Sequence, residues 1–446
     1  MKSGSPKAPI VEVPWPSPGR GWLLVLLLAL ASIVSQFDRT VINLMVEPLK
    51  AEFGLNDTAF GMLQSVAFGI FYVVACIPIG RLADNHSRKI IIGAALAMWS
   101  LFAMSSGLAR SYVQLFLARI GVAVGEASLT PAGLSMLSDH FPPERLGRPV
   151  AGFLLSAPIG QGLAFIGGGS LLAWLGTAPL ATSGPLNDLA PWQVAFLVVG
   201  APGLLLVPLF FLIREPERRG TGAPTLTKRE VMNVILSRRH ALIPMFCGFA
   251  MVLLVAYSFA IWTPALFERS YGWGPGEIGL WYGLVLMVFG TSGVFAAGIL
   301  SDWLGGRRQS DAPLKVAAGG FAVCGASGSL APLMPTPELA LGLIAVATFF
   351  GNMPFACAAT ALQLIVPNRA RAQVSALYVT FTTLVGLTLG PLIVGFMTDF
   401  VFRDPAQIRY SLSLVIAFAA PIMVGMMMLA LKPYRAARHE MFDHHL

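Results

Sequence analysis

Gly80-Arg81-Leu82-Ala83-Asp84 recurs 218 residues later as Gly298-Ile299-Leu300-Ser301-Asp302. Two further pairs of segments match in the same way: Gly54–Gly61 with Gly272–Gly279 at the same offset, and Pro143–Arg145 with Pro367–Arg369 at an offset of 224 residues. Because several independent matches share nearly one spacing, the chain is predicted to consist of two similar halves.

The composition is that of a protein that crosses a membrane many times. Of its 446 residues, 56% are hydrophobic and 12% are charged, and the mean hydropathy is +0.72; soluble domains carry about 25% charged residues. A hydrocarbon core about 30 Å thick requires roughly 20 residues of helix. Runs that meet this length begin near Gly21, Ala59, Ile90, Val113, Pro149, Trp192, Ala241, Glu277, Leu314, Glu338, Gln373 and Tyr410. We predict an all-α membrane protein with twelve transmembrane helices in two six-helix, pseudo-symmetric bundles, an architecture typical of transporters with a central site.

The basic residues predict the topology. Only five of the 30 Lys and Arg residues fall in the loops opposite the termini, namely Lys50, Arg110, Arg269, Arg403 and Arg409. The positive-inside rule therefore places both termini in the cytoplasm, with the chain in the cell inner membrane. The predicted parts are an N-tail at 1–20, a first bundle at 21–213, a linker at 214–240, a second bundle at 241–431 and a C-tail at 432–446. We expect no cleavable signal sequence.

A charged pair interrupts the first apolar run. Asp38 and Arg39 follow the hydrocarbon stretch Trp22–Val34, and the chain stays mostly apolar to Val46. A central Asp or Arg costs about 2.5–3.5 kcal/mol on insertion scales and usually faces a cavity or a partner. Two interpretations follow, a structural ion pair that locks two helices and a substrate or proton site.

A second charged pair lies in the fourth run. Arg119 and Glu126 are seven residues apart, which is two helical turns, so their side chains lie on roughly one face. The repeat offsets place uncharged residues at the matching positions of the second half: Ala256, Tyr257, Leu343 and Phe350. Charge confined to one half favours a functional site over an architectural feature.

The repeated segment itself resembles a known signature. Gly80–Asp84, followed by Arg88, resembles the loop between helices two and three of the major facilitator superfamily, with Asn85 in place of the usual Arg. The resemblance implies that Gly80 permits close packing, that Asp84 meets a helix N-terminus and that basic residues bridge the cytoplasmic gate. Asp302 holds the corresponding position in the second copy.

Four further stretches resemble the Spinster branch of that superfamily: Phe37–Ile42, Gly125–Pro131, Ser138–Arg145 and Pro191–Phe196. The likeness is densest from Phe37 to Gly169. It implies a proton-linked secondary carrier of a lysophospholipid or a sphingoid phosphate. The same four charges also resemble those of organic-anion and sugar-acid symporters, and a drug-type efflux carrier is a further alternative.

The four charges predict a coupling scheme. Asp38 and Glu126 would carry the proton, and Arg39 and Arg119 would bind an anionic cargo. An anion that competes for an arginine would release a carboxylate and favour its protonation, which links cargo and proton.

The facing wall is predicted to come from the second half. Tyr257 and Asn352 are the expected contacts, with Thr263 and Gln363 as further polar positions, although each can instead be a packing hydrogen bond. The residues Phe349, Phe350, Met353 and Phe355 can line an acyl-chain pocket or simply pack.

Other classes of function have little support in the sequence. It contains no CxxC pair, no HExxH motif, no Ser/His/Asp grouping and no nucleotide-binding loop, so neither an enzyme nor an ATP-driven pump is expected. The four cysteines, Cys76, Cys247, Cys324 and Cys357, lie in apolar runs and predict no disulfide or metal site. We expect no cofactor beyond the proton gradient, no nucleic-acid partner, contacts with membrane lipids and a monomer. A non-transporting receptor or scaffold remains as an alternative.

Overall fold

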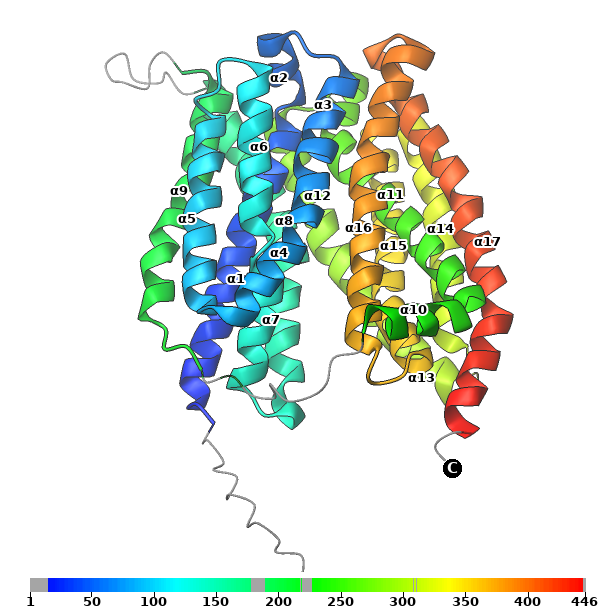
Figure 1. Cartoon of the computed structure of the whole chain (residues 1–446). Coiled ribbons are helices and arrows are strands. Elements are labelled where there is room, and N and C mark those ends of the chain that lie inside the picture. The colour runs from blue at the N-terminus through cyan, green and yellow to red at the C-terminus, as the bar shows by residue number, and fades with distance from the viewer. Residues whose placement is uncertain are drawn as a thin grey trace, which may run out of the picture.

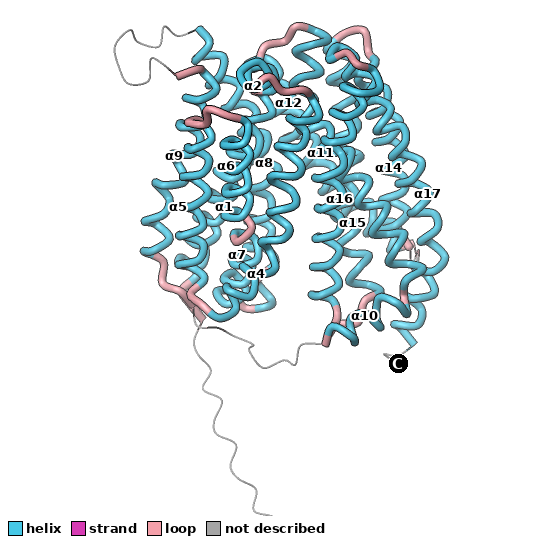
Figure 2. The backbone as a smooth tube through the Cα atoms, turned by 45° about the horizontal axis from the view of Figure 1, so that its top comes forward, coloured by secondary structure: helices cyan, strands magenta, loops and turns pink. Residues whose placement is uncertain are grey.

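The computed structural model describes residues 15–177, 189–216, 218, 227–307, 309 and 311–443. Among these residues, twelve helices are long and apolar enough to cross a membrane. Each predicted apolar run lies in one of the twelve and begins within five residues of its start. The predicted fold class is therefore confirmed, and in the described part of the chain Figure 2 shows helices and loops without a strand.

The first bundle is formed by the blue to green helices of Figure 1. They are α1 (Pro18–Thr40), α2 (Val46–Phe53), α3 (Asp57–Gln64), α4 (Phe71–Asn85), α5 (Arg88–Ser106), α6 (Tyr112–Glu126), α7 (Leu129–His140), α8 (Gly147–Thr177) and α9 (Pro191–Leu212). One span comprises α3 and α4, joined by a wider helical turn at Ser65–Ile70, and another comprises α6 and α7. The short α2 does not span.

The second bundle repeats this plan after the linker. Its helices are α11 (Arg239–Tyr271), α12 (Pro275–Val285), α13 (Thr291–Gly306), α14 (Ala312–Leu330), α15 (Pro337–Ile365), α16 (Arg371–Phe396) and α17 (Ile408–Asp443). A wider turn at Leu286–Gly290 joins α12 to α13, as Ser65–Ile70 joins α3 to α4.

The repeat detected in the sequence is also a repeat of backbone geometry. Gly54 and Gly272, which are equivalent at the 218-residue offset, end α2 and α11 with φ angles of 63° and 71°. This left-handed conformation favours glycine because it has no Cβ. The next helix then has a residue that favours a helix start in each half: Asn56 caps α3 by accepting from the amide of Ala59, and Pro275 occupies the first turn of α12.

The predicted linker and C-tail are partly helical. The linker 214–240 contains a helix, α10 (Lys228–Ser237), because Thr227 and Glu230 form a capping box at its start. The last helix continues to Asp443, beyond the predicted end of the bundle at 431, despite its Pro421 and Pro433. Most of the N-tail, together with His444 and His445, lies outside the described residues.

The two bundles meet mainly through α8 against α12 and α3 against α16. We call the end at which α1 begins, α10 lies and α17 ends the linker face, at the bottom of Figure 1, and the opposite end the loop face. Glycines allow both contacts to be close. A Cβ added at Gly61 of α3 would lie 3.0 Å from the carbonyl oxygen of Pro391, and one added at the equivalent Gly279 of α12 would lie 2.4 Å from that of Phe165.

The close approach at Gly279 gives a first prediction. Gly279→Ala should destabilise the contact between α8 and α12 by about 1–3 kcal/mol, because backbone must move to admit the methyl group. We expect a lower melting temperature and faster hydrogen exchange in the loop-face ends of both helices. Gly298→Ala is the matched control, since an added Cβ there meets nothing within 4 Å and alanine favours helix. A Gly279→Ala protein that melts and exchanges like the parent would contradict this account.

Candidate functional site

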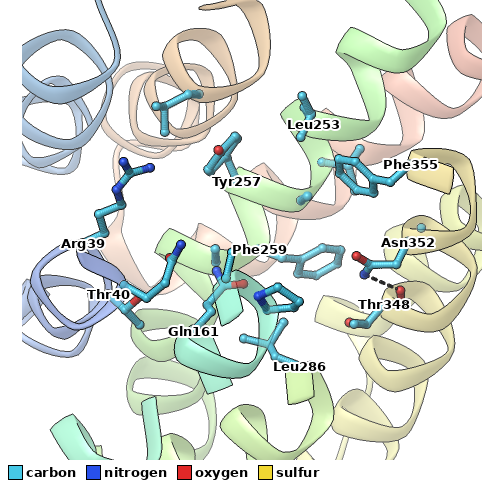
Figure 3. Close-up of a pocket in the computed structure, with 18 of the residues that line it drawn as sticks. Arg39, Thr40, Gln161, Leu253, Tyr257, Phe259, Leu286, Thr348, Asn352 and Phe355 are labelled. Carbon is cyan, nitrogen blue, oxygen red and sulfur yellow. Dashed lines mark hydrogen bonds between the residues drawn. The ribbon is translucent and has the colours of Figure 1, made fainter. Parts of the chain in front are cut away.

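A cavity of about 720 Å³ lies between the bundles. The first bundle supplies its polar wall, which contains Gln36, Arg39, Thr40, Asn43, Gln64, Arg119 and Gln161. The second bundle supplies an uncharged and mainly apolar wall, which includes Leu253, Ala256, Tyr257, Phe259, Leu286, Phe295, Thr348, Asn352 and Phe355. Figure 3 shows Arg39 and Tyr257 reaching into the cavity from opposite sides. The cavity is therefore polar and cationic on one side and apolar on the other.

Glu126 and Arg39 join two helices at the polar wall. Glu126 is 1% exposed, and its Oε2 accepts hydrogen bonds from Ser35 Oγ at 2.7 Å and from Arg39 Nε. The Arg39 guanidinium also lies over the rings of Phe68 and Tyr72, at 4.6 and 4.8 Å from their centroids. One carboxylate and two aromatic faces thus hold Arg39, and its side chain keeps 25% exposure.

Asp38 has a different environment from its neighbour. It is 1% exposed, and neither carboxylate oxygen has a hydrogen-bond partner among the described residues. Successive residues of a helix point about 100° apart, so Asp38 and Arg39 do not face the same group. Arg119 donates to the backbone carbonyl of Asp38 at 3.0 Å rather than to a carboxylate. Glu126 therefore pairs with Arg39 of α1, although Arg119 shares its own helix.

A chain of amide groups connects Arg119 to the other bundle. Arg119 donates to Gln64 Oε1 at 3.2 Å, Gln64 donates to Asn43 Oδ1, and Asn43 donates to the carbonyl oxygen of Ala260 in α11 at 3.1 Å. Sequence reasoning missed Asn43 and Gln64. The available signal was a carboxamide inside an apolar run, which usually binds across helices.

The arginines and the carboxylates occupy different layers of the polar wall. Arg39 and Arg119 line the cavity, whereas the lining residues in the described part of the chain include neither Asp38 nor Glu126. A molecule in the cavity thus contacts the guanidinium groups, and the carboxylates lie behind the lining.

Only some of the contacts predicted for the second bundle line the cavity. Tyr257 and Asn352 both line the cavity, and Asn352 donates to the carbonyl of Thr348 at 2.8 Å (Figure 3). Thr263 is buried away from the cavity and Gln363 is exposed. Of the four apolar candidates, Phe355 lines the cavity, whereas Phe349, Phe350 and Met353 do not.

An ion-pair network closes the loop face between the bundles. Arg269 at the end of α11 binds Glu47 at 2.6 Å and Asp57 at 2.7 Å, and Asp57 also binds Lys50. Asp399 of the second bundle accepts from the amides of Asp57 and Thr58 at 3.1 and 2.6 Å, so it caps the start of α3. We call these residues the loop-face lock. From the sequence, Arg269 and Lys50 were expected only as loop charges, because nothing in their spacing brings them together.

The repeated signature segment has a different role at the linker face from the one expected. Arg88 is buried, and its guanidinium binds Asp139 of α7, Ser135 Oγ at 2.9 Å and Glu215 at 3.2 Å. These partners belong to the first bundle and the segment after α9, so Arg88 does not bridge to the second bundle in this conformation. A buried guanidinium satisfied by nearby carboxylates has no reach left for a distant partner.

Other positions of the signature are open in this conformation. A Cβ added at Gly80 would meet nothing within 4 Å, so the described residues do not show the expected close packing there. Asp302 is exposed, and the side chain of Asp84 lies outside the described residues.

The carboxylate of Glu215, which binds Arg88, is held in its ionised form. Burial alone would raise the pKa of Glu215, but the hydrogen bonds from Ser87 and Arg88 outweigh burial and lower that pKa below its ordinary value.

Two six-helix repeats around a central charged cavity, locked at one face, define a multi-pass membrane transporter. The chain belongs to the Major Facilitator Superfamily, whose family profile matches residues 28–391.

Relatives within this superfamily span several kinds of transporter. The chain is 28% identical to an MFS-type efflux pump of Mycolicibacterium smegmatis over 92% of this chain and 91% of the relative. It is 26% identical to a probable L-galactonate transporter of Escherichia coli, over 84% and 82% of the two chains. It is 27% identical to protein spinster of Drosophila melanogaster, over 90% and 66%.

The fold is also similar to a solved one. The crystal structure of a bacterial homolog to the human lysosomal transporter Spinster, in an inward-facing and occupied conformation, matches with a TM-score of 0.76 at 24% identity, covering 95% of this chain and 98% of that one. The Spinster resemblance expected from the sequence is confirmed.

Proposed function

We propose that this transporter is a proton-coupled secondary carrier of an amphipathic anion, of the lysophospholipid or sphingoid-phosphate class. The observation that carries the proposal is the division of the cavity into a wall with two arginines and an uncharged, mainly apolar wall. An anionic headgroup satisfies the guanidinium groups, and an acyl chain gains about 0.8 kcal/mol for each methylene that it buries.

The arrangement of Arg39 supports proton coupling. Its guanidinium is held by Glu126 on one side and reaches the cavity on the other. An anion that draws Arg39 away leaves Glu126 as a buried, unpaired carboxylate, which costs several kcal/mol unless it takes up a proton. Asp38, whose carboxylate oxygens have no partner among the described residues, is the second proton carrier of the proposal. Cargo binding and proton uptake thereby favour each other.

The relay from Arg119 supports a link between the site and the bundle interface. Arg119, Gln64 and Asn43 connect the charged cluster to the backbone of α11 at Ala260. A cargo that rearranges Arg119 therefore alters a contact between the bundles. Alternating access follows in this proposal if the loop-face lock opens as the linker face closes.

The proposal includes an orientation. The loops of the linker face carry most of the basic residues, so this face is placed in the cytoplasm, with the chain in the inner membrane. The cavity reaches Ala151 and Leu154, near the linker-face start of α8, and the lock covers the opposite face. This conformation is thus the inward-open one in the proposed orientation.

A second candidate cargo is a small organic anion such as a sugar acid. It is favoured by the two arginines together with the likeness to a probable L-galactonate transporter. Such a molecule leaves the apolar wall formed by Phe259, Phe295 and Leu286 without a partner. The two candidates therefore differ in their dependence on an acyl chain.

A thermal-shift screen tests the cargo class. The purified protein is heated with lysophosphatidylglycerol of 16 and 8 acyl carbons, with lysophosphatidylcholine and with galactonate. We expect the long-chain anion to stabilise most, by about 2.7 kcal/mol at one hundred times its Kd. Arg119→Ala should lose much of this shift, and Arg110→Ala, an exposed arginine of a loop-face turn, should keep it. Stabilisation by galactonate alone would favour the second candidate, and no shift with any compound would count against both.

A further inference from the structure

The helix α10 lies crosswise to the spanning helices. Figure 1 shows it running across the linker-face part of the second bundle, in front of α16. It contacts α11 and α16. Because the spanning helices cross the membrane, a helix perpendicular to them at this end lies in the plane of the membrane surface, at the level of the lipid headgroups.

One side of α10 packs on the protein. Val231, Val234 and Ile235 recur at the spacing of one helix face and are half-buried against the core of the second bundle. At 100° per residue, Met232 and Leu236 lie together on a second side. They are 50% and 51% exposed. This second side is therefore apolar and is left about half uncovered by the described part of the chain.

The remaining side of α10 is polar. Glu230, Asn233 and Ser237 are exposed and share it. The helix thus has three sectors, of which one faces protein and one is suited to water. The sector of Met232 and Leu236 lies between them, as expected of a helix that rests at a membrane surface.

Positive charge flanks the uncovered apolar sector at both ends. Arg229 precedes Met232 by three residues, and Arg239, the first residue of α11, follows Leu236 by three residues; both arginines are exposed. The neighbouring Glu230, which caps the helix by accepting from the amide and hydroxyl of Thr227, offsets only one of these two charges. Two cations around a short apolar strip match an anionic headgroup above its acyl chains.

We propose that α10 is a binding surface for anionic phospholipids in the leaflet at the linker face. Arg229 and Arg239 contact the phosphate groups, and Met232 and Leu236 enter the boundary of the acyl chains. The proposal concerns membrane lipid at the outer surface of the bundle, and it does not depend on the cargo of the central cavity or on proton coupling.

Hydrogen exchange of the full-length protein in lipid nanodiscs tests this surface. Nanodiscs of phosphatidylglycerol are compared with nanodiscs of phosphatidylcholine at 0.15 M NaCl. We expect amides of residues 230–237 to exchange more slowly in phosphatidylglycerol. Each arginine near an anionic surface contributes about fivefold to binding. Arg229→Gln with Arg239→Gln should therefore remove about 25-fold of protection, and 0.5 M NaCl should remove much of it in the parent protein.

Two controls separate lipid binding from folding of the segment. Arg110→Gln removes an exposed arginine at the opposite face and should leave the exchange of α10 unchanged. Met232→Ser with Leu236→Ser should weaken protection in both lipids while the preference for phosphatidylglycerol persists, because the arginines remain. Equal exchange of α10 in the two lipids, or an unchanged preference after removal of both arginines, would overturn the proposal.

Discussion

Glu126→Gln should bind the anionic cargo about tenfold more tightly at neutral pH and should lose the part of the pH dependence of binding that comes from Glu126. Glutamine cannot hold Arg39 as a carboxylate does, and a charged hydrogen bond of this kind contributes about 1.5–3 kcal/mol. Arg39 is then free for the anion at every pH. In the parent protein, affinity should rise as the pH falls, because protonation of Glu126 releases Arg39.

The same variant should accumulate less cargo against a gradient than the parent protein. Without a carboxylate at position 126, cargo binding no longer takes up a proton there, so a pH difference across the membrane cannot drive net uptake by that route. Calorimetry from pH 5 to pH 8, with the strongest binder of the thermal-shift screen, measures affinity and proton uptake together. Uptake into vesicles with and without a pH gradient measures the transport consequence.

Ser35→Ala is the matched control for Glu126. Ser35 donates to the same oxygen, Oε2, at 2.7 Å, but carries no charge. Its removal should leave the pH dependence of binding in place. If Glu126→Gln kept the pH dependence and the gradient-driven uptake of the parent, Glu126 would not be the coupling carboxylate, whereas the cargo class would remain open to the separate screen.

The fold could be predicted because its determinants are local and repeated. Apolar runs of membrane length specify spans regardless of what they pack against, and Gly54 and Gly272 end equivalent helices for the same steric reason. The helix α10 was missed because its ten residues lie in a polar linker, where length and hydropathy give no signal. Its capping box, Thr227 and Glu230, was the local signal available.

The four charged residues of the site could be predicted from the sequence, but which carboxylate pairs with which arginine could not. Buried Asp38, Arg39, Arg119 and Glu126 are costly in an apolar run, so composition alone marks them. Which carboxylate meets which arginine depends on the rotation of α1 against α6, and one sequence does not determine that rotation.

Contacts between the two halves could not be predicted from the sequence. Asp57 and Arg269 are 212 residues apart, and the partner of Asn43 in the other bundle is a backbone oxygen, that of Ala260. The fold brings these groups together, and no motif in either segment indicates the partner.

Arg269→Gln should open the loop face. Arg269 is the residue of the second bundle that binds both Glu47 and Asp57 of the first. The side chain of Asp57 is fully buried, and Lys50 remains its partner when Arg269 is replaced. Removal of the guanidinium should therefore cost about 3 kcal/mol, the low end for a broken buried pair, whereas the more exposed Glu47 adds little. A change of about 3 kcal/mol shifts the equilibrium between closed and open forms by more than a hundredfold.

Spin labels at Glu52 and Ala406, two exposed loop-face positions on opposite bundles, measure this opening by the distance between them. The half-buried Cys76 and Cys247 are first replaced by Ala to prevent their labelling. We expect a population with a longer distance between the labels in Arg269→Gln and an unchanged distance distribution in Arg110→Gln. The distance distribution of Arg269→Lys should lie between these two, because a lysine keeps the charge but lacks the planar guanidinium that binds two carboxylates.

A distribution in Arg269→Gln that matched the parent would mean that other contacts suffice to hold the loop face closed. These are the hydrogen bonds from the amides of α3 to Asp399 and the close contacts at Gly61 and Gly279. The closure would then depend on backbone packing, and the ion pairs would be expendable.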